Sequence, residues 1–103
     1  MLYDRSDCSG VMMIAKKCVV GGRVQGVFYR ATTAQRAREL GVTGHAINLA
    51  DGRVEVVACG ETHALKIFIE FLWTGSSASK VTSVEVSDLH FEEAQRPNGF
   101  RTG

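Results

Sequence analysis

Long hydrophobic runs, a signal-peptide pattern in the opening residues and a strong net charge are all missing from the given sequence. No apolar run approaches the roughly 18 residues that a membrane-spanning helix needs. The opening MLYDRSDCSG carries acidic residues where a signal peptide has positive charge. We therefore expect a cytoplasmic protein that engages no membrane. The formal net charge of +1 also argues against a nucleic-acid binder, so any attraction for anions must come from a local site.

Cysteine is scarce, and its spacing favours no cross-link. The chain has three cysteines, Cys8, Cys18 and Cys59, and this odd count without a CxxC pair indicates neither a disulfide framework nor a zinc site. Cys18 and Cys59 lie in strand-like runs, where a buried thiol is usually a small hydrophobe. The three histidines are far apart and lack metal-ligand spacing, so we expect no metal site.

The chain length allows one hydrophobic core. With 103 residues, the sequence is long enough for a single domain but too short for two. Residues 1–11 show no hydrophobic periodicity, and we expect them to form a flexible arm. Residues 12–103 are then expected to form the domain.

The first half of the domain has the pattern of a strand, a helix and a hairpin. Residues 11–20 are apolar and β-rich, which predicts a strand. Ala31, Ala34, Ala37 and Leu40 recur every three residues, which predicts a helix with these residues on one side and Gly41 as its C-terminal stop. The strand-like runs VTGHAINL and RVEVVACG follow, and the Asp-Gly between them is a strong hairpin signal.

The second half predicts another helix and further strands. A helix is expected over residues 61–74, with a wide apolar stripe formed by Leu65, Phe68, Ile69, Leu72 and Trp73. The run KVTSVEVSDLHFE alternates with period two, as a half-buried strand does, and residues 100–102 form a last short strand. The β-α-β-β-α-β order predicts an α+β fold. We expect a ferredoxin-like α/β sandwich with an antiparallel four- to five-stranded sheet and two helices on one face.

The stretch GGRVQGVFYR, residues 21–30, is the most informative part of the sequence. A glycine-rich turn that runs from a strand into a helix can point several backbone N–H groups at one anion, and the helix dipole favours negative charge there. Gly22 and Gly26 allow a tight turn, and Arg30 follows where its guanidinium can bind the same anion. The alternative is a purely structural turn with a solvated Arg30. The stretch is not a nucleotide P-loop, because Val27 and Phe28 stand where the lysine and hydroxyl are required.

Two segments resemble the signatures of a known family. GRVQGVFYR is similar to the first signature of the acylphosphatases, and GHAINLADGRVEVVACG is similar to the second; the similarity runs from about Val19 into the second predicted helix. The resemblance implies hydrolysis of acyl phosphates to a carboxylate and inorganic phosphate, without a metal, an organic cofactor or a phosphoenzyme. It implies that Arg30 is the catalytic arginine and that Asn48 orients the attacking water. It also implies that the phosphate is held by backbone amides of the loop residues Arg23, Val24, Gln25, Gly26, Val27, Phe28 and Tyr29.

The resemblance leaves some questions open. His45, Ile47 and Gly21 depart from the usual family residues, which puts substrate preference and local stability in doubt. Asn48 precedes a hairpin turn, a position also typical of an asparagine that bonds its own backbone in an Asx turn. Inorganic phosphate is expected as product and inhibitor, and the protein is expected to be a monomer.

Two rival functions use the same fold. The first is a non-catalytic ligand- or RNA-binding module, but no strand carries the paired aromatic residues of an RNA-recognition sheet. The second is a domain of a larger maturation enzyme, which the short chain after the last predicted strand disfavours.

Overall fold

A computed structural model describes residues 13–89 and 99–102 of the chain. The expected arm over residues 1–11, together with Cys8, lies outside the described residues. The described elements, in chain order, are β1 (Met13–Arg23), α1 (Tyr29–Leu40), β2 (Thr43–Asn48), β3 (Val54–Glu61), α2 (Thr62–Leu72), β4 (Lys80–Leu89) and β5 (Phe100–Thr102). This order confirms the ferredoxin-like α+β fold that the sequence predicts.

The five strands form one sheet with the order β4-β1-β3-β2-β5. β1 pairs antiparallel with both β3 and β4, and β3 pairs antiparallel with β2. The expectation of a wholly antiparallel sheet is wrong at one edge, because β5 pairs parallel with β2. The reason is geometric: β4 runs opposite to β2, so the chain leaves β4 at the end of the sheet where β2 begins, and a strand that starts there runs parallel to β2.

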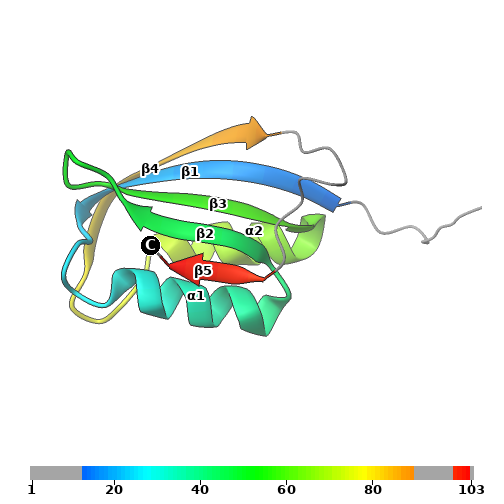
Figure 1. The fold of residues 1–103 in the computed structure, drawn as a ribbon, viewed down its shortest axis with the longest axis horizontal. Coiled ribbons are helices and arrows are strands. Elements are labelled where there is room, and N and C mark those ends of the chain that lie inside the picture. Colours follow the sequence, from blue (N-terminus) through cyan, green and yellow to red (C-terminus); the bar gives the residue numbers. More distant parts are fainter. Residues whose placement is uncertain (1–12, 90–98, 103) are drawn as a thin grey trace, which may run out of the picture.

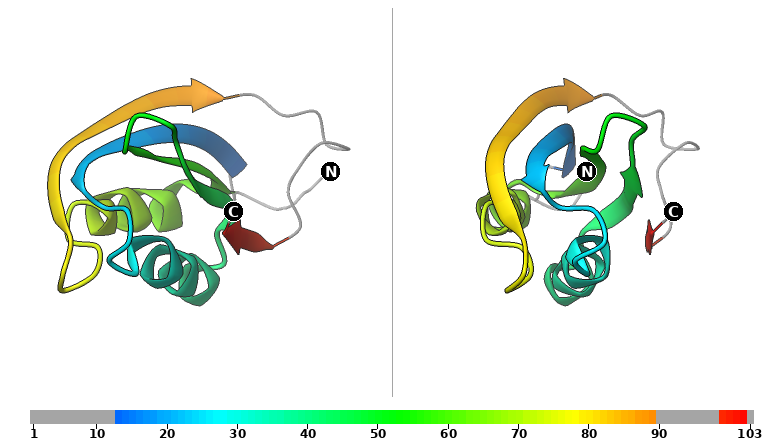
Figure 2. Two further views of the ribbon diagram at one scale, coloured as in Figure 1. Left: turned by 60° about the vertical axis from the view of Figure 1, so that its left-hand side comes forward. Right: turned by 90° about the vertical axis from the view of Figure 1, so that its left-hand side faces the viewer.

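Both helices cover the same face of the sheet, as Figure 1 and the two rotated views in Figure 2 show. The core lies between these layers. Phe68 of α2 is fully buried and packs edge-on against Phe100 of β5, with ring centroids 5.8 Å apart. Ala34 and Ala37 of α1 are also fully buried, and their small side chains let the helix lie close to the sheet. Edge-to-face aromatic packing adds to the hydrophobic stabilisation of such a core.

Two details of the predicted helix faces are wrong. Ala31 is exposed, although Ala34 and Ala37 are buried. A three-residue repeat drifts around the helix, because each residue advances by roughly 100°, so four such positions cannot share one face. Trp73 is 53% exposed rather than part of the apolar stripe. α2 ends at Leu72, so Trp73 is its C-cap residue and no longer faces the sheet.

The cysteines behave as small apolar side chains. Cys18 and Cys59 are both free and buried, and their burial matches the prediction from their strand positions. Burial raises the pKa of the Cys18 thiol to about 11, against a smaller opposing effect of Lys16. At neutral pH this thiol is therefore protonated.

No helix within residues 13–89 and 99–102 is both long and apolar enough to cross a bilayer.

Candidate active site

The chain leaves β1 at a glycine that no other residue can replace without a backbone shift. Gly22 has φ of 117°, and the pairing of β1 with β4 shifts register between Gly21 and Gly22. A Cβ atom on Gly22 would lie 2.1 Å from the carbonyl oxygen of Lys80. This close approach of two backbones explains the glycine and directs residues 24–28 away from the sheet as a loop that leads into α1.

The backbone amides of this loop have no partner among the described residues. No hydrogen bond within the described residues uses the backbone N–H of residues 24–28 as its donor. Gly26 and Phe28 both have left-handed φ values, 74° and 61°, a conformation that curls successive N–H groups toward one side of the chain. Phe28 is also the N-cap of α1, where no side chain caps the helix and no acidic residue lies in the first turn. The loop and helix start therefore present uncompensated N–H dipoles, the arrangement that binds anions.

A pocket of about 280 Å³ lies beside these amides. It brings together four of the predicted loop residues and the predicted catalytic arginine. Its lining consists of Val24, Gly26, Phe28, Tyr29, Arg30, Ala31 and Thr102. Arg30 is half-buried, and its guanidinium forms no ion pair with another described residue, so its charge is available in the pocket. Three other predicted loop residues, Arg23, Gln25 and Val27, are not part of the lining.

Asn48 does not line this pocket but lies near one wall of it. Thr102, a lining residue, is opposite Ala46 in the β2–β5 register, and Asn48 is two residues further along β2. Asn48 is exposed, and its side-chain amide has no hydrogen bond to another described residue. The side-chain amide is therefore free to bind a water or a substrate group.

The Asx-turn interpretation of Asn48 is wrong, because a different residue has that role. Asp51 Oδ1 accepts a hydrogen bond of 3.1 Å from the backbone N–H of Arg53, and this same bond is the main cause that lowers the pKa of Asp51. Gly52, with φ of 94°, closes the turn by donating its N–H to the carbonyl of Leu49. Asp51 therefore organises the hairpin and leaves the Asn48 amide unused.

Side chains from distant parts of the chain brace the loop. Ser76 Oγ donates to the carbonyl oxygen of Val27 at 2.6 Å, and the hydroxyl of Tyr29 donates to the carbonyl oxygen of Leu72 at 2.7 Å. Burial raises the pKa of Tyr29 well above its ordinary value, so the hydroxyl remains a donor. The side-chain amide of Gln25 donates to the carbonyls of Leu49 and Arg53. Figure 1 shows the three connections concerned, β1–α1, β2–β3 and α2–β4, at the same end of the molecule.

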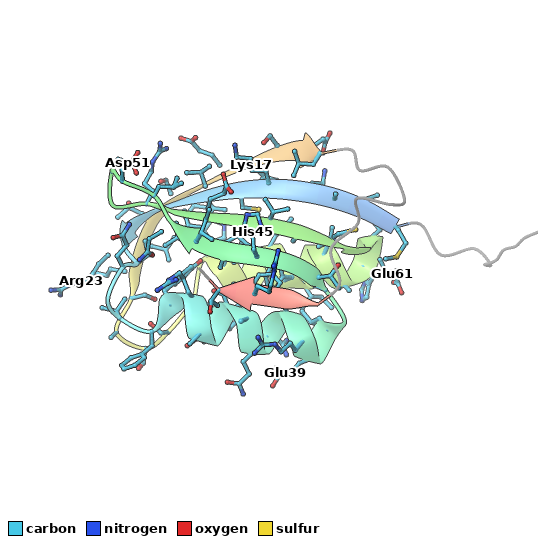
Figure 3. The ribbon with its side chains drawn as sticks, in the orientation of Figure 1. Lys17, Arg23, Glu39, His45, Asp51 and Glu61 are labelled. Atoms are coloured by element: carbon cyan, nitrogen blue, oxygen red, sulfur yellow. The ribbon has the colours of Figure 1, made fainter. Side chains whose placement is uncertain are left out.

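Sequence reasoning did not assign two residues, Ser76 and Thr102, to the site. Ser76 appears in the sequence only as one serine of a polar loop, and Thr102 as part of a last short strand. Both reach the site through tertiary contacts, for which the local pattern carries no signal. Arg23, in contrast, is exposed, and Figure 3 shows its side chain directed away from the body of the protein. Its backbone rather than its side chain is the part that the loop can use.

The charged cluster of His45, Glu55 and Lys17 is not part of the pocket lining. His45 forms a 3.0 Å pair with Glu55 on the sheet face that the helices leave uncovered, and Lys17 lies 3.5 Å from the same carboxylate (Figure 3). The hydrogen bond from His45, assisted by Lys17, lowers the pKa of Glu55. Among residues 13–89 and 99–102, no three His, Cys, Asp or Glu side chains are grouped as metal ligands.

Known proteins similar to this chain share both its sequence and its fold. The acylphosphatase family model matches residues 16–102. An acylphosphatase of Chromohalobacter salexigens is 51% identical over 87 residues, which are 84% of this chain and 93% of the relative. The structure of an acylphosphatase from Coxiella burnetii has a TM-score of 0.81 and 36% identity, with 88% of this chain and 93% of that chain covered. The acylphosphatase from Bacillus subtilis also has a TM-score of 0.81, with 35% identity and coverage of 89% and 99%.

Proposed function

This chain belongs to the acylphosphatase family, and on that premise we propose which of its residues hold the phosphate and which direct the water. As a hydrolase of this family, it cleaves the carboxyl–phosphate bond of an acyl phosphate. We assign phosphate binding to the backbone N–H groups of residues 23–30 together with the guanidinium of Arg30. We assign orientation of the attacking water to the side-chain amide of Asn48.

The observation that carries the assignment is a group of neighbouring donors that have no acceptor among the described residues. Within residues 13–89 and 99–102, the N–H groups of residues 24–28 have no acceptor, and the start of α1 has neither a capping side chain nor an acidic residue. Arg30, whose guanidinium has no ion pair in the part of the chain that the structure describes, lines the pocket beside them. A guanidinium and fixed amides together suit a phosphoryl group, because both donate hydrogen bonds to its oxygens without having to reorganise.

The reaction needs little more than this arrangement. An acyl phosphate already has a good leaving group, a carboxylate of low pKa that leaves without being protonated. Its transition state is loose, with charge spread over the three equatorial oxygens of the phosphoryl group and with attacking and leaving oxygens in line. Catalysis is then mainly positioning and charge stabilisation, which the loop amides and Arg30 supply. No metal ion is required for either task in this scheme.

Asn48 suits the positioning of water rather than its deprotonation. Its side-chain carbonyl can accept a hydrogen bond from the water while its amide donates one to a neighbouring oxygen. An amide is not a base at neutral pH, so a phosphate oxygen takes the proton of the attacking water in this scheme. The side chain is exposed on β2 and has no hydrogen bond to any residue that the structure describes, and both observations support this role.

Hydrolysis of benzoyl phosphate in the presence of excess chelator tests the proposal. We expect phosphate release well above the spontaneous rate, and we expect Arg30→Gln to lower the rate by about 10²–10³-fold. Arg30→Gln should also weaken inhibition by inorganic phosphate, since both ligands share the guanidinium. Loss of the wild-type activity in chelator would contradict the metal-independent scheme.

Arg36→Gln is the matched control on the same helix. Arg36 pairs with Glu39 at 3.2 Å and lies over the ring of Phe71 at 5.9 Å, away from the pocket. Its substitution should change both the rate and the phosphate inhibition constant by no more than about twofold. Equal losses in the two variants would show that removal of any α1 charge lowers activity, and the assignment of Arg30 would fail.

A further inference from the structure

The two parts of the proposed site come from strands that are not neighbours. The phosphate-binding loop follows β1, whereas Asn48 ends β2, and β3 lies between these strands in the sheet. Pairing within the sheet therefore connects the loop and Asn48 only indirectly. In-line attack requires the water and the phosphorus to be placed accurately relative to each other. Some contact other than strand pairing must therefore fix Asn48 relative to the loop.

One side chain connects the two parts directly. Gln25 Nε2 donates a hydrogen bond of 2.8 Å to the carbonyl oxygen of Leu49 and one of 3.0 Å to the carbonyl oxygen of Arg53. Within the described residues, these are the only hydrogen bonds between residues 24–28 and the β2–β3 hairpin. Leu49 and Arg53 form the first pair beyond Asn48 and Val54, the last pair of the strand ladder. Gln25 therefore holds the hairpin directly beside Asn48.

The chemistry of the contact requires a primary amide. Both acceptors are carbonyl oxygens, so the bridging atom must carry two N–H groups, which the side-chain nitrogen of glutamine provides. Both carbonyls keep a second partner in the hairpin: Leu49 O accepts from Gly52 N, and Arg53 O accepts from Leu49 N. The hairpin is thus closed by its own backbone hydrogen bonds. The Gln25 amide does not hold the hairpin in shape but attaches it to the loop.

The other end of the loop is fixed independently. Ser76 donates a hydrogen bond to the carbonyl of Val27. The buried Tyr29 donates one to the carbonyl of Leu72, at the end of α2. These contacts lie on the α2 side of the loop, away from the β2–β3 hairpin. Loss of the Gln25 amide should therefore displace the hairpin relative to the phosphate-binding amides, while the amides keep their shape.

We propose that Gln25 is a positioning residue that sets Asn48, through the hairpin carbonyls of Leu49 and Arg53, in line with the bound phosphate. The inference rests on the proposed function, because it assumes that the loop holds the phosphate and that Asn48 directs the water. It assigns a role to the side chain of Gln25 in addition to that of its backbone amide. The role predicts a loss in kcat without a matching loss in phosphate affinity.

Kinetics of Gln25→Met test the proposal, since methionine has nearly the same length but no N–H donor. We expect kcat for benzoyl phosphate to fall by about tenfold or more, because small misplacements of a reacting group are costly. The inhibition constant of inorganic phosphate should change by less than about twofold, because the loop amides and Arg30 are retained. Gln35→Met, on the exposed side of α1, is the matched control and should leave both values unchanged. A parallel loss of kcat and phosphate affinity would overturn the proposal.

A double-mutant cycle separates positioning from general support of the fold. In the Asn48→Ala background, Gln25→Met should lower kcat by less than about twofold, because the group that it positions is already missing. If the kcat losses of the two single variants instead multiply in the double variant, Gln25 acts independently of Asn48. The single variant Asn48→Ala separates a failure of the proposed function from a failure of the role of Gln25. If it keeps full kcat, the proposed function fails; if it loses kcat while the two effects multiply, only the role of Gln25 fails.

A second substitution covers the case in which Gln25→Met folds poorly. Gln25→Glu has the shape of glutamine, but its ionised carboxylate faces two carbonyl oxygens, whereas the protonated acid regains one donor. Its kcat relative to the wild type should therefore rise as the pH is lowered from about 7 to about 4.5, toward the ordinary pKa range of a glutamate. A relative kcat that does not change over this range would contradict the proposal.

Discussion

The hydroxyl of Tyr29 donates a 2.7 Å hydrogen bond to the carbonyl oxygen of Leu72, and so joins the first residue of α1 to the last residue of α2. The side chain is almost completely buried and lies directly after the phosphate-binding loop. The contact fixes the start of α1, whose first residues Tyr29, Arg30 and Ala31 line the pocket. It therefore links the packing of the two helices to the shape of the proposed site.

We expect Tyr29→Phe to lower stability more than activity. The ring remains in the core, but the Leu72 carbonyl loses a buried donor, which should cost about 1 kcal/mol in the free energy of unfolding. The rate should fall much less than in Asn48→Ala, since the hydroxyl does not contact the phosphate in our scheme. Urea unfolding and benzoyl phosphate kinetics measure the two effects. A larger loss in kcat than in Asn48→Ala would mean that the hydroxyl has a direct part in the reaction.

Gly22→Ala should be among the most destabilising substitutions in the loop region. The new methyl would lie 2.1 Å from the Lys80 carbonyl at a residue with left-handed φ, so β1 and β4 must separate. We expect a loss of about 3 kcal/mol or more in the free energy of unfolding. Gly52→Ala is the control: its φ is 94°, but a Cβ there meets nothing within 4 Å. It should cost only about 1 kcal/mol, from the backbone conformation alone. Similar losses for both would exclude the clash as the cause.

Asn48→Ala should separate catalysis from stability. The side chain is exposed and has no hydrogen bond to a described residue, so the free energy of unfolding should change by less than about 0.5 kcal/mol. We expect kcat to fall by about 10²–10³-fold with little change in KM, as for the loss of one positioned donor. Steady-state kinetics and thermal unfolding of the same preparation provide the comparison. Full kcat in the variant would remove Asn48 from the mechanism.

The rate should depend little on pH between about 5 and 7.5, because no group in the proposed mechanism titrates there. An arginine guanidinium stays protonated and an amide has no acidic proton in this range. The histidine that lies closest along β2, His45, is paired with Glu55 on the uncovered sheet face instead of facing the pocket. A pH profile of kcat/KM for benzoyl phosphate, corrected for spontaneous hydrolysis, checks this expectation. A bell-shaped profile near the histidine range would indicate a missing acid or base.

Glu55 should make the stability depend on pH under acidic conditions. Its pKa is lowered in the folded state by the hydrogen bond from His45 and by Lys17. A carboxylate with a depressed folded pKa contributes stability above its unfolded pKa and loses that contribution as the pH falls through the folded value. Glu55→Gln should therefore cost about 0.5 kcal/mol at pH 7, and the difference from the wild type should shrink as the pH falls below the ordinary pKa range of a glutamate.

Urea unfolding of both proteins at several pH values measures this effect. Glu61→Gln is the control, because Glu61 is exposed and has no ion pair among the described residues (Figure 3). Its substitution should leave the pH dependence unchanged. If the cost of Glu55→Gln did not vary with pH, the pair on the uncovered sheet face would contribute nothing through its charge.

The local features of this protein follow from its sequence alone. Hydrophobic periodicity predicts the order of strands and helices, and Gly41 ends α1 in the left-handed conformation that its position predicts. The stretch from Gly22 to Arg30 predicts an anion-binding turn before a helix, because positive φ and free N–H groups depend mainly on neighbouring residues. These properties act over a few residues, so the sequence carries them directly.

Which distant groups meet at the site depends instead on how the whole chain folds. The parallel direction of β5 and the exposure of Trp73 depend on where β4 and α2 end, which periodicity does not fix. The contacts of Ser76 and Gln25 join segments that chain folding brings together. Such contacts form only when the whole sheet and both helices are packed, because a side chain finds a distant carbonyl through the path of the entire chain and not through its neighbours.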